Sequence, residues 1–381
     1  MSFILTEEQE ELLALVRKFS EKEILPYAHQ MDVEAHFVPG LIQKIADLGF
    51  MGINVPEEYG GVGADEVTKA LVIMEFAKYD ASVAELLAVH TLSSDIILKH
   101  GTPEQKEKYL TKACTGAVGA FALTEPNAGS DAAAAKTKAI SQGDEYIING
   151  SKCFISNMGQ DEGDYVILIV LTDPEKKTKG MSAIIVDRDT PGFTVPKTED
   201  KMGLRAAPVS ELYFDECHVP KSQLLGEEGN PFAIAMAGLD GGRIGMASQA
   251  VGLAESCIAE SVEYSTQRVQ FGKPVNANQG LQWYLADMAT KTEAAKALTL
   301  NAAALRQAGK NITKEAAMAK YYASETAVEV ANKALQIHGG YGYMKEYAIE
   351  RQYRDARIIP IYEGTSEVQK MVISRAVING K

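Results

Sequence analysis

The spacing of the apolar residues changes twice along this chain, and the change limits the folds that the chain can adopt. Up to about residue 117 the apolar residues recur at helical spacing. Residues 118–228 instead contain strand-length runs such as "YVILIVLTD", separated by Gly, Pro and Asp. The helical spacing then returns in 229–381, in runs long enough for bundle helices. We therefore expect an α+β protein with a helical, a β and a second helical region.

Short signals place some of these elements. Residues 6–9, "TEEQ", form a capping box for a first helix, and Pro103 suits the first position of a later one. In "EYIINGSKCFIS" the pair Asn149-Gly150 predicts a hairpin turn. We expect about seven strands in the β region, without the alternating helices of a parallel sheet. The long C-terminal helices are expected over 242–268, 281–307 and 314–338.

The composition excludes several classes of partner. The chain carries 38 Lys and Arg against 51 Asp and Glu, a net charge of −13, which disfavours nucleic acids and anionic membranes. The four cysteines are scattered without a CxxC pair, so we expect free thiols. No leader pattern and no run of eighteen apolar residues is evident, so we expect a cytoplasmic protein without a membrane span.

Several catalytic motifs are missing from the sequence. It contains no GxGxxG after a predicted strand, no GxxxxGK[ST], no HExxH and no GxSxG. The six histidines show no ligand spacing. A Rossmann dinucleotide site, a P-loop and a metal centre are therefore not expected.

Four segments remain as candidates, each with a plainer alternative. "FALTEPNAGSDAAA" at 121–134 could present N–H and O–H donors to a polar ring or phosphate, or be a solvated loop. "QIHGGYGYMKEYAIERQYRDAR" at 336–357 could admit a flat ligand beside its glycines, or simply cap a helix. In 265–280, Arg268 suits a phosphate but also a helix end. In 239–249, an acidic N-cap would explain Asp240, but not the nearby arginine.

A fifth segment, "PIYEGTSEVQ", places Glu363 between an aromatic residue and Gly364. The "SEVQ" that follows is a capping box, which predicts a helix beginning at about Ser366. Glu363 is then either a solvated acid favourable to a helix N-terminus or a base buried against a ligand.

Together and in this order, these segments resemble the acyl-CoA dehydrogenase family. "ALTEPNAGSDAAA", "KMGLR", "RVQFGKP", "QIHGGYGYMKEYAIERQYRD" and "IYEGTSEVQ" stand at the family's relative positions, so the resemblance covers essentially the whole chain. The sequence as a whole is most similar to the short-chain branch of the family, which includes butyryl-CoA dehydrogenase and acryloyl-CoA reductase. The resemblance implies an N-terminal helical domain (1–117), a central β-barrel-like domain (118–228) and a C-terminal four-helix bundle (229–381).

The resemblance also implies non-covalently bound FAD, held partly across a subunit interface. Contacts to the cofactor are expected from Phe121, Leu123, Thr124, Gly129, Ser130, Phe154, Ile155, Ser156, Arg268, Phe271, Gln279, Gln336, Ile337, His338, Gly339, Gly340, Thr365, Ser366 and Glu367. Many relatives have Trp before "ITN" where this sequence has Phe154 and Ser156, so the flavin contacts there depart from the common pattern.

The implied reaction is the α,β-dehydrogenation of a short-chain acyl-CoA to the 2-enoyl-CoA, or its reverse. Removal of the weakly acidic α-proton needs a positioned carboxylate, and Glu363 fits that role. Substrate contacts are expected from Ser130, Asp240, Gly241, Gly242, Arg243 and Gly364. Electron-transferring flavoprotein is the expected partner, and a homotetramer (a dimer of dimers) the expected assembly. A flavin oxidase and a non-catalytic acyl-CoA-binding relative are the alternatives.

Overall fold

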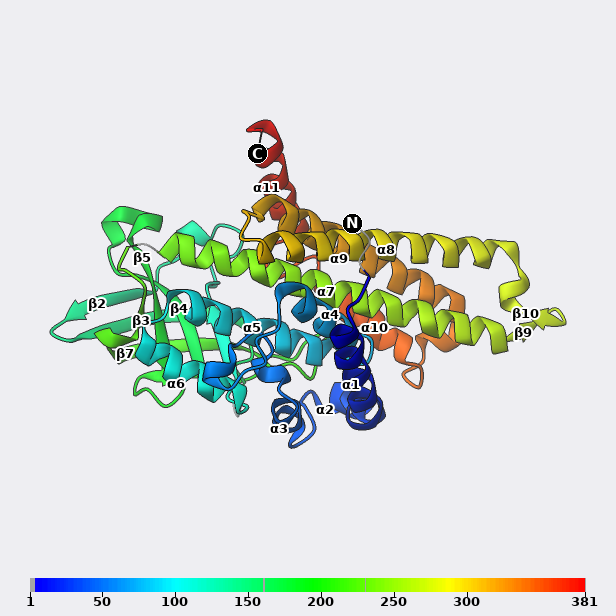
Figure 1. The fold of residues 1–381 in the computed structure, drawn as a ribbon, viewed down its shortest axis with the longest axis horizontal. Coiled ribbons are helices and arrows are strands. Elements are labelled where there is room, and N and C mark those ends of the chain that lie inside the picture. Colours follow the sequence, from blue (N-terminus) through cyan, green and yellow to red (C-terminus); the bar gives the residue numbers. More distant parts are fainter. Residues whose placement is uncertain (1–3, 160–161, 230, 381) are drawn as a thin grey trace.

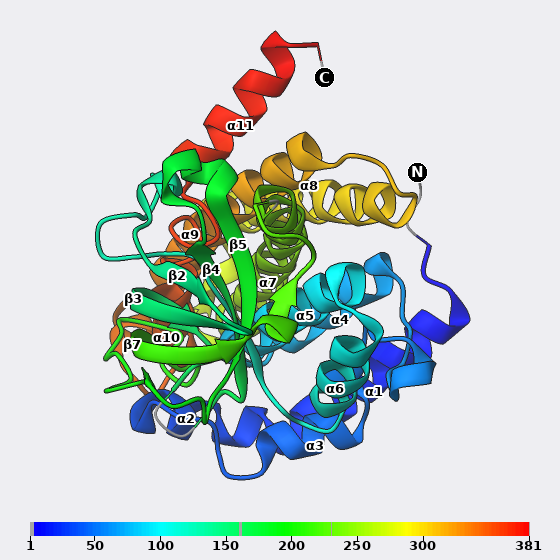
Figure 2. The same cartoon turned by 90° about the vertical axis from the view of Figure 1, so that its left-hand side faces the viewer.

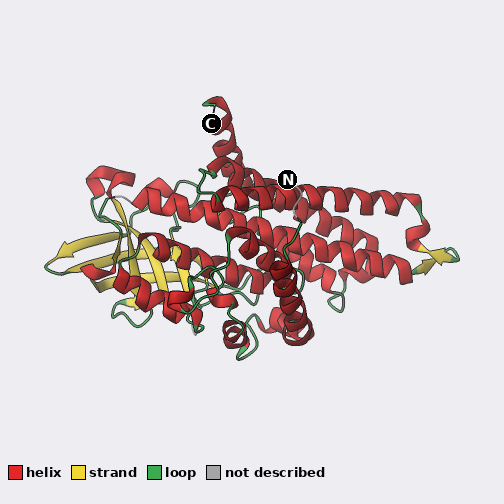
Figure 3. Cartoon of the chain, viewed as in Figure 1, coloured by secondary structure: helices red, strands yellow, loops and turns green. Residues whose placement is uncertain are grey.

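All but two short strands gather at one end of an elongated molecule whose remaining length is mostly helical (Figure 3). The computed structural model describes residues 4–159, 162–229 and 231–380. Six α-helices precede the strands: α1 (Glu7–Glu23), α2 (Ala28–Glu34), α3 (Leu41–Asp47), α4 (Glu66–Ala77), α5 (Ala81–His100) and α6 (Pro103–Cys114). The capping box is confirmed, since Thr6 Oγ1 accepts from Gln9 N and Gln9 Oε1 accepts from Thr6 N.

Eight strands form the main sheet of the described chain, one more than expected. They are β1 (Gly119–Ala122), β2 (Lys138–Gln142), β3 (Glu145–Ser156), β4 (Tyr165–Leu171), β5 (Met181–Asp187), β6 (Phe193–Thr194), β7 (Val209–Pro220) and β8 (Leu224–Leu225). Their order is β6-β7-β3-β2-β4-β5-β8, and β1 pairs in parallel with β4. Figure 2 shows this sheet toward the viewer, with α5 and α6 beside it.

β4 is buried on both faces. Ile167 and Ile169 pack into a cluster that includes α5 and α6, whereas Val166 and Leu168 pack against inner residues of the neighbouring strands. Because successive side chains of a strand point to opposite faces, β4 joins the helices to a core enclosed by the curled sheet.

The predicted hairpin turn at Asn149-Gly150 is wrong. β3 continues through both residues, and the turn lies at Gly143-Asp144, between β2 and β3. Gly150 has φ 146° beside a shift in the register with β7, and the Asn149 side chain bonds Glu216 of β7. The Asn-Gly pair therefore forms a β-bulge, because β7 pairs with β3 on both sides of it.

Three long helices run side by side along the molecule (Figure 1): α7 (Pro231–Gln267), α8 (Gln279–Gln307) and α9 (Thr313–His338). A small hairpin of β9 (Val269–Gln270) and β10 (Lys273–Pro274) joins α7 to α8 at the end far from the sheet. α10 (Ala348–Ala356) packs on α9, and α11 (Ser366–Ile378) projects outward with the C-terminus.

The interior helix α5 is more apolar than the sequence analysis suggested. Of the helices in the described part of the chain, it alone is long and apolar enough to cross a bilayer, contrary to expectation. Within the fold, however, 89% of its apolar window is buried. Contacts with α4, α7 and β1 explain this composition, as in a core helix of a globular protein.

Candidate active site

Glu363 lies in the short turn between α10 and α11. Both Glu363 (φ 51°) and Gly364 (φ 90°) adopt left-handed backbone conformations, which is uncommon for a glutamate and is typical of strained functional turns. α11 begins at Ser366 as predicted, but its cap is Thr365, whose Oγ1 accepts from Val368 N at 3.3 Å. Ser366 does not cap the helix, because its hydroxyl donates to Glu325 of α9.

Buried side chains hold the backbone of this turn. Lys320 of α9 donates from Nζ to Gly364 O at 2.7 Å, and Gln369 of α11 donates from Nε2 to both Glu363 O and Gly364 O. The Tyr362 hydroxyl bonds Gln249 of α7. The main chain is thus anchored from three helices, so the Glu363 carboxyl group is presented from a fixed position.

The Glu363 carboxyl group is enclosed but not fully hydrogen-bonded. Its Oε2 is buried and has no hydrogen-bond partner among the described residues. A Cβ added to Gly242 of α7 would lie 2.9 Å from Oε2 and 3.5 Å from Leu92 of α5, so a larger residue here would force the carboxylate to move. Burial raises the pKa of Glu363, partly offset by the charges of Arg243 and Lys320.

Of the predicted substrate residues of α7, Gly242 and Arg243 lie near this carboxylate and Gly241 faces Arg306, and the local interpretation of Asp240 was wrong. Asp240 is not an N-cap, because α7 begins at Pro231. Asp240 is instead buried and accepts from Arg243 Nη1 at 2.6 Å and from Thr313 Oγ1 at 2.7 Å. Arg243 is therefore a buried cation held one helical turn from Asp240, with its charge near Glu363.

The segments after β1 and at the end of β3 also lie together. Lys152 is fully buried and donates from Nζ to Glu125 Oε1 at 2.8 Å and to Leu123 O at 2.9 Å, and Cys153 N donates to Thr124 O. This pairing places 121–125 beside the predicted residues at the end of β3. Phe154 has φ 58° and is 73% exposed, so its ring is free to contact a ligand.

The predicted cofactor residues from Arg268 to Gly340 lie far from these segments in the same chain, whereas Thr365, Ser366 and Glu367 lie at the start of α11, next to Glu363. Arg268 follows α7, and its guanidinium stacks over Tyr341, 5.2 Å from the ring centroid. It is about 39 Å along the α7 axis from Gly242, at a rise of 1.5 Å per residue. Phe271, Gln279, Gln336, Gly339 and Gly340 lie at the same end and are exposed. His338 is buried there, with its ring stacked on Tyr264.

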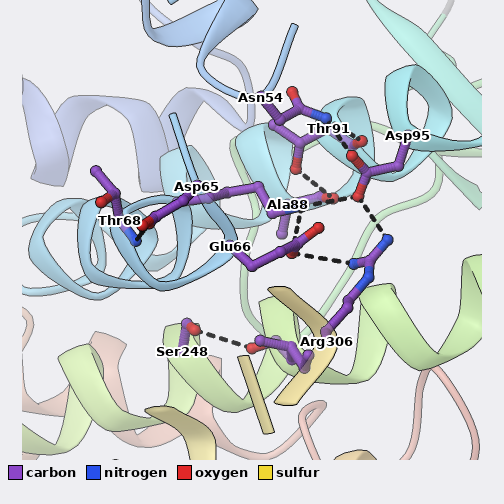
Figure 4. A network of polar contacts seen from close by, with 11 residues as sticks. Asn54, Asp65, Glu66, Thr68, Ala88, Thr91, Asp95, Ser248 and Arg306 are labelled. Carbon is purple, nitrogen blue, oxygen red and sulfur yellow. Dashed lines mark hydrogen bonds and ion pairs between the residues drawn. The ribbon is translucent and has the colours of Figure 1, made fainter. Parts of the chain in front are cut away.

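A buried ionic network fixes α5 next to the candidate site. Asp95 of α5 accepts from Asn54, from Lys69 of α4 at 2.7 Å and from Arg306 of α8 at 3.0 Å. Figure 4 shows Arg306 reaching both Asp95 and Glu66. Because these residues come from three helices, the network sets how the N-terminal and C-terminal helices meet beside Gly241 of α7, whose position faces Arg306.

Sequence reasoning missed three polar residues of the site: Lys320, Gln369 and Glu85. Glu85 of α5 is buried, and its Oε1 accepts from Ser156 Oγ at 2.7 Å. Lys320 and Glu85 each stand alone in an apolar helical run, in "AAMAKYY" and "SVAELLAV". A lone charge at such a position requires a buried partner, which is the signal that could have identified them.

Comparisons with known proteins agree along the whole chain. Family models described as acyl-CoA dehydrogenase N-terminal, middle and C-terminal domains match residues 6–117, 120–217 and 229–378. The chain is 52% identical to the acryloyl-CoA reductase (NADH) of Anaerotignum propionicum, covering 99% of this chain and 96% of the relative. It is 46% identical to a short-chain specific acyl-CoA dehydrogenase of Clostridium acetobutylicum, covering 98% and 99%.

Solved structures show the same likeness. Butyryl-CoA dehydrogenase of Megasphaera elsdenii superposes with a TM-score of 0.96 at 45% identity, covering 99% of this chain and all of the other. A chain from the structure of the electron transferring flavoprotein of Acidaminococcus fermentans matches with a TM-score of 0.97 at 46% identity, with the same coverage. At these identities the likeness extends beyond the fold to the family.

Proposed function

The chain belongs to the acyl-CoA dehydrogenase family, a family of flavin-dependent oxidoreductases, and on that premise we propose that it interconverts short-chain acyl-CoA and 2-enoyl-CoA thioesters. Glu363 is the base. The observation that carries this role is the buried Glu363 Oε2, which lies against Gly242 and has no hydrogen-bond partner in the described chain. A base must keep such a free oxygen for the substrate proton.

The surrounding residues prepare Glu363 for proton transfer. Burial raises its pKa toward the working pH, while Arg243 and Lys320 keep the ionised form accessible. Lys320 and Gln369 fix the turn, so the carboxylate meets the substrate Cα without reorganising. Gly364 lets the thioester approach the main chain, where the Glu363 N–H donates to the thioester carbonyl and stabilises the charge that develops on it.

The cofactor that we propose is FAD, which supplies the hydride chemistry that no side chain provides. The residues present fit a flat aromatic group. Phe154 is 73% exposed beside Ser156, and Phe271 is 99% exposed at the end of the molecule far from the sheet. Gly339 and Gly340 have open space around them, which would admit a pyrophosphate. Of the expected contacts, those from 121 to 156 would hold the flavin ring and those from 268 to 340 the adenine side.

Because those two sets are separated by most of the length of α7, one chain does not bring them to a single cofactor. We propose that a second copy supplies the far set, within a homotetramer. Trp283, in the first turns of α8, and Tyr343, shortly after α9, are 62% and 79% exposed, and exposed aromatic residues are enriched at subunit interfaces. Electron-transferring flavoprotein is the proposed redox partner, by analogy with the related structure. The cytoplasm is the proposed location, since the four cysteines are free, as expected in a reducing compartment.

Glu363→Gln tests the proposal. Purified variant protein should remain yellow, because the carboxyl group does not hold the flavin, but anaerobic butyryl-CoA should no longer bleach it. Glu260→Gln is the matched control, since burial also raises the pKa of Glu260, whose Oε1 is already bonded by Gln352. Glu260 lies about 27 Å along α7 from Gly242. Normal bleaching of Glu363→Gln would show that another group is the base.

A further inference from the structure

Glu85 is a second acid near Glu363, and the proposed chemistry does not use it. Its side chain is buried, with 2% of the residue exposed. Oε1 accepts from Ser156, but Oε2 is buried and meets no hydrogen-bond donor among the described residues. Burial raises the pKa of Glu85 to about 7, against the hydrogen bond from Ser156 and the charge of Lys201. A buried oxygen without a donor is unfavourable unless a ligand supplies one.

Packing between α5 and α7 places this oxygen relative to the base. Gln249 of α7 bonds Ala81 O, a Cβ on Gly245 would touch Ala88 at 3.1 Å, and one on Gly242 would lie 3.5 Å from Leu92. Higher residue numbers on α5 thus meet lower numbers on α7, so the two helices are antiparallel.

The positions of the two acids follow from this packing. The Glu363 carboxylate lies beside Leu92, and Glu85 is on the same side of α5, about two turns or roughly 10 Å away. The charge of Glu363 further raises the pKa of Glu85. Burial raises the pKa of Tyr362, and the charges of both acids raise it further. With a contact of about 3 Å at each end, an acyl chain of four or five carbons that carries a terminal donor spans roughly this distance between the base and Glu85.

We propose that Glu85 Oε2 accepts a hydrogen bond from a hydroxyl or amino group on the distal part of the acyl chain, so that the enzyme prefers polar short-chain acyl-CoA substrates to plain ones. This inference rests on the proposed function. An apolar chain would cover Oε2 and leave it without a partner, whereas a donor on the chain would satisfy it. Sites that hydrogen-bond a substrate group discriminate strongly against the analogue that lacks the group.

The test compares acyl-CoA esters in pairs of equal chain length: propionyl with 3-aminopropionyl, butyryl with 4-hydroxybutyryl, and valeryl with 5-hydroxyvaleryl. Anaerobic flavin bleaching and kcat/KM are measured for each. We expect kcat/KM to be about tenfold or more higher for the polar member of at least one pair. A preference for the amino ester would indicate charge pairing, and one for a hydroxy ester a hydrogen bond without charge pairing; both support the inference.

Glu85→Leu should abolish or reverse that preference while plain butyryl-CoA still reacts, and Glu260→Gln should leave the preference unchanged. Equal or lower kcat/KM for every polar member in the wild-type enzyme overturns the inference, whether or not Glu85→Leu folds. A preference that persists in Glu85→Leu also overturns it. Bleaching by plain esters alone leaves the proposed function intact. Bleaching by none of the esters refutes the proposed function, and the inference with it.

Discussion

Lys320→Met should change the pH dependence of turnover as well as its rate. Lys320 is fully buried, its Nζ donates to Gly364 O at 2.7 Å, and burial lowers its pKa to about 8 against the opposing charge of Glu363. The ammonium is therefore still mostly protonated at pH 7. Methionine keeps a similar apolar length but removes both the hydrogen bond and the charge.

The expected fall in kcat and the shift of the pH profile follow from the loss of the hydrogen bond and of the charge. A hydrogen bond from a charged donor contributes roughly 1.5–3 kcal/mol, so loosening the Glu363 turn should lower kcat by about tenfold to a hundredfold. The charge of Lys320 lowers the pKa of Glu363, so its removal lets that pKa rise further. The base must be ionised to act, so the acidic limb of the kcat/KM profile should move to higher pH, and activity should partly recover above that limb.

The assay is a steady-state pH profile with butyryl-CoA and an artificial electron acceptor. Lys333→Met, on the same helix α9, is the control, because Lys333 pairs with Glu329 at the surface and should leave the profile unchanged. A merely structural role for Lys320 would lower kcat equally at all pH values. An acidic limb that stays in place, or that moves to lower pH, would refute the reasoning.

Two further substitutions test the packing of the site. In Gly242→Ala the new Cβ would lie 2.9 Å from Glu363 Oε2, so kcat should fall at least about tenfold with the thermal midpoint nearly unchanged; unchanged kcat would contradict this geometry. Asp95→Ala removes one of the two acids that pair with Lys69 and Arg306, and Glu66 remains. Breaking a buried pair costs about 3–5 kcal/mol, and the remaining pairs with Glu66 should keep the loss at or below this range, measured as a lower urea midpoint at pH 7. Burial raises the pKa of Asp95, but the two cations hold it below its usual value, so this stability is present above about pH 4 and is lost as the pH falls through the lower folded pKa. Equal midpoints at pH 7 would show that the network contributes little.

Local signals in the sequence predicted much of the fold. The change of period separated helices from strands because side-chain spacing reflects local backbone geometry. The capping box at 6–9 and the start of α11 were placed correctly for the same reason. Asn149-Gly150 failed because pairing with β7, distant in sequence, converted a turn signal into a bulge.

The candidate site also has features that the local sequence predicted and features that only the tertiary structure decided. The segment "YEGT" alone left Glu363 either a solvated acid or a base, and only the resemblance of all the segments together to the acyl-CoA dehydrogenase family favoured the base. That Glu363 Oε2 is buried without a partner depends on α5 and α7 closing around it, and Lys320 meets Gly364 only through the fold. Burial and long-range hydrogen bonds decide which acids are surface charges and which are reactive, and they are properties of the tertiary structure rather than of any short stretch of sequence.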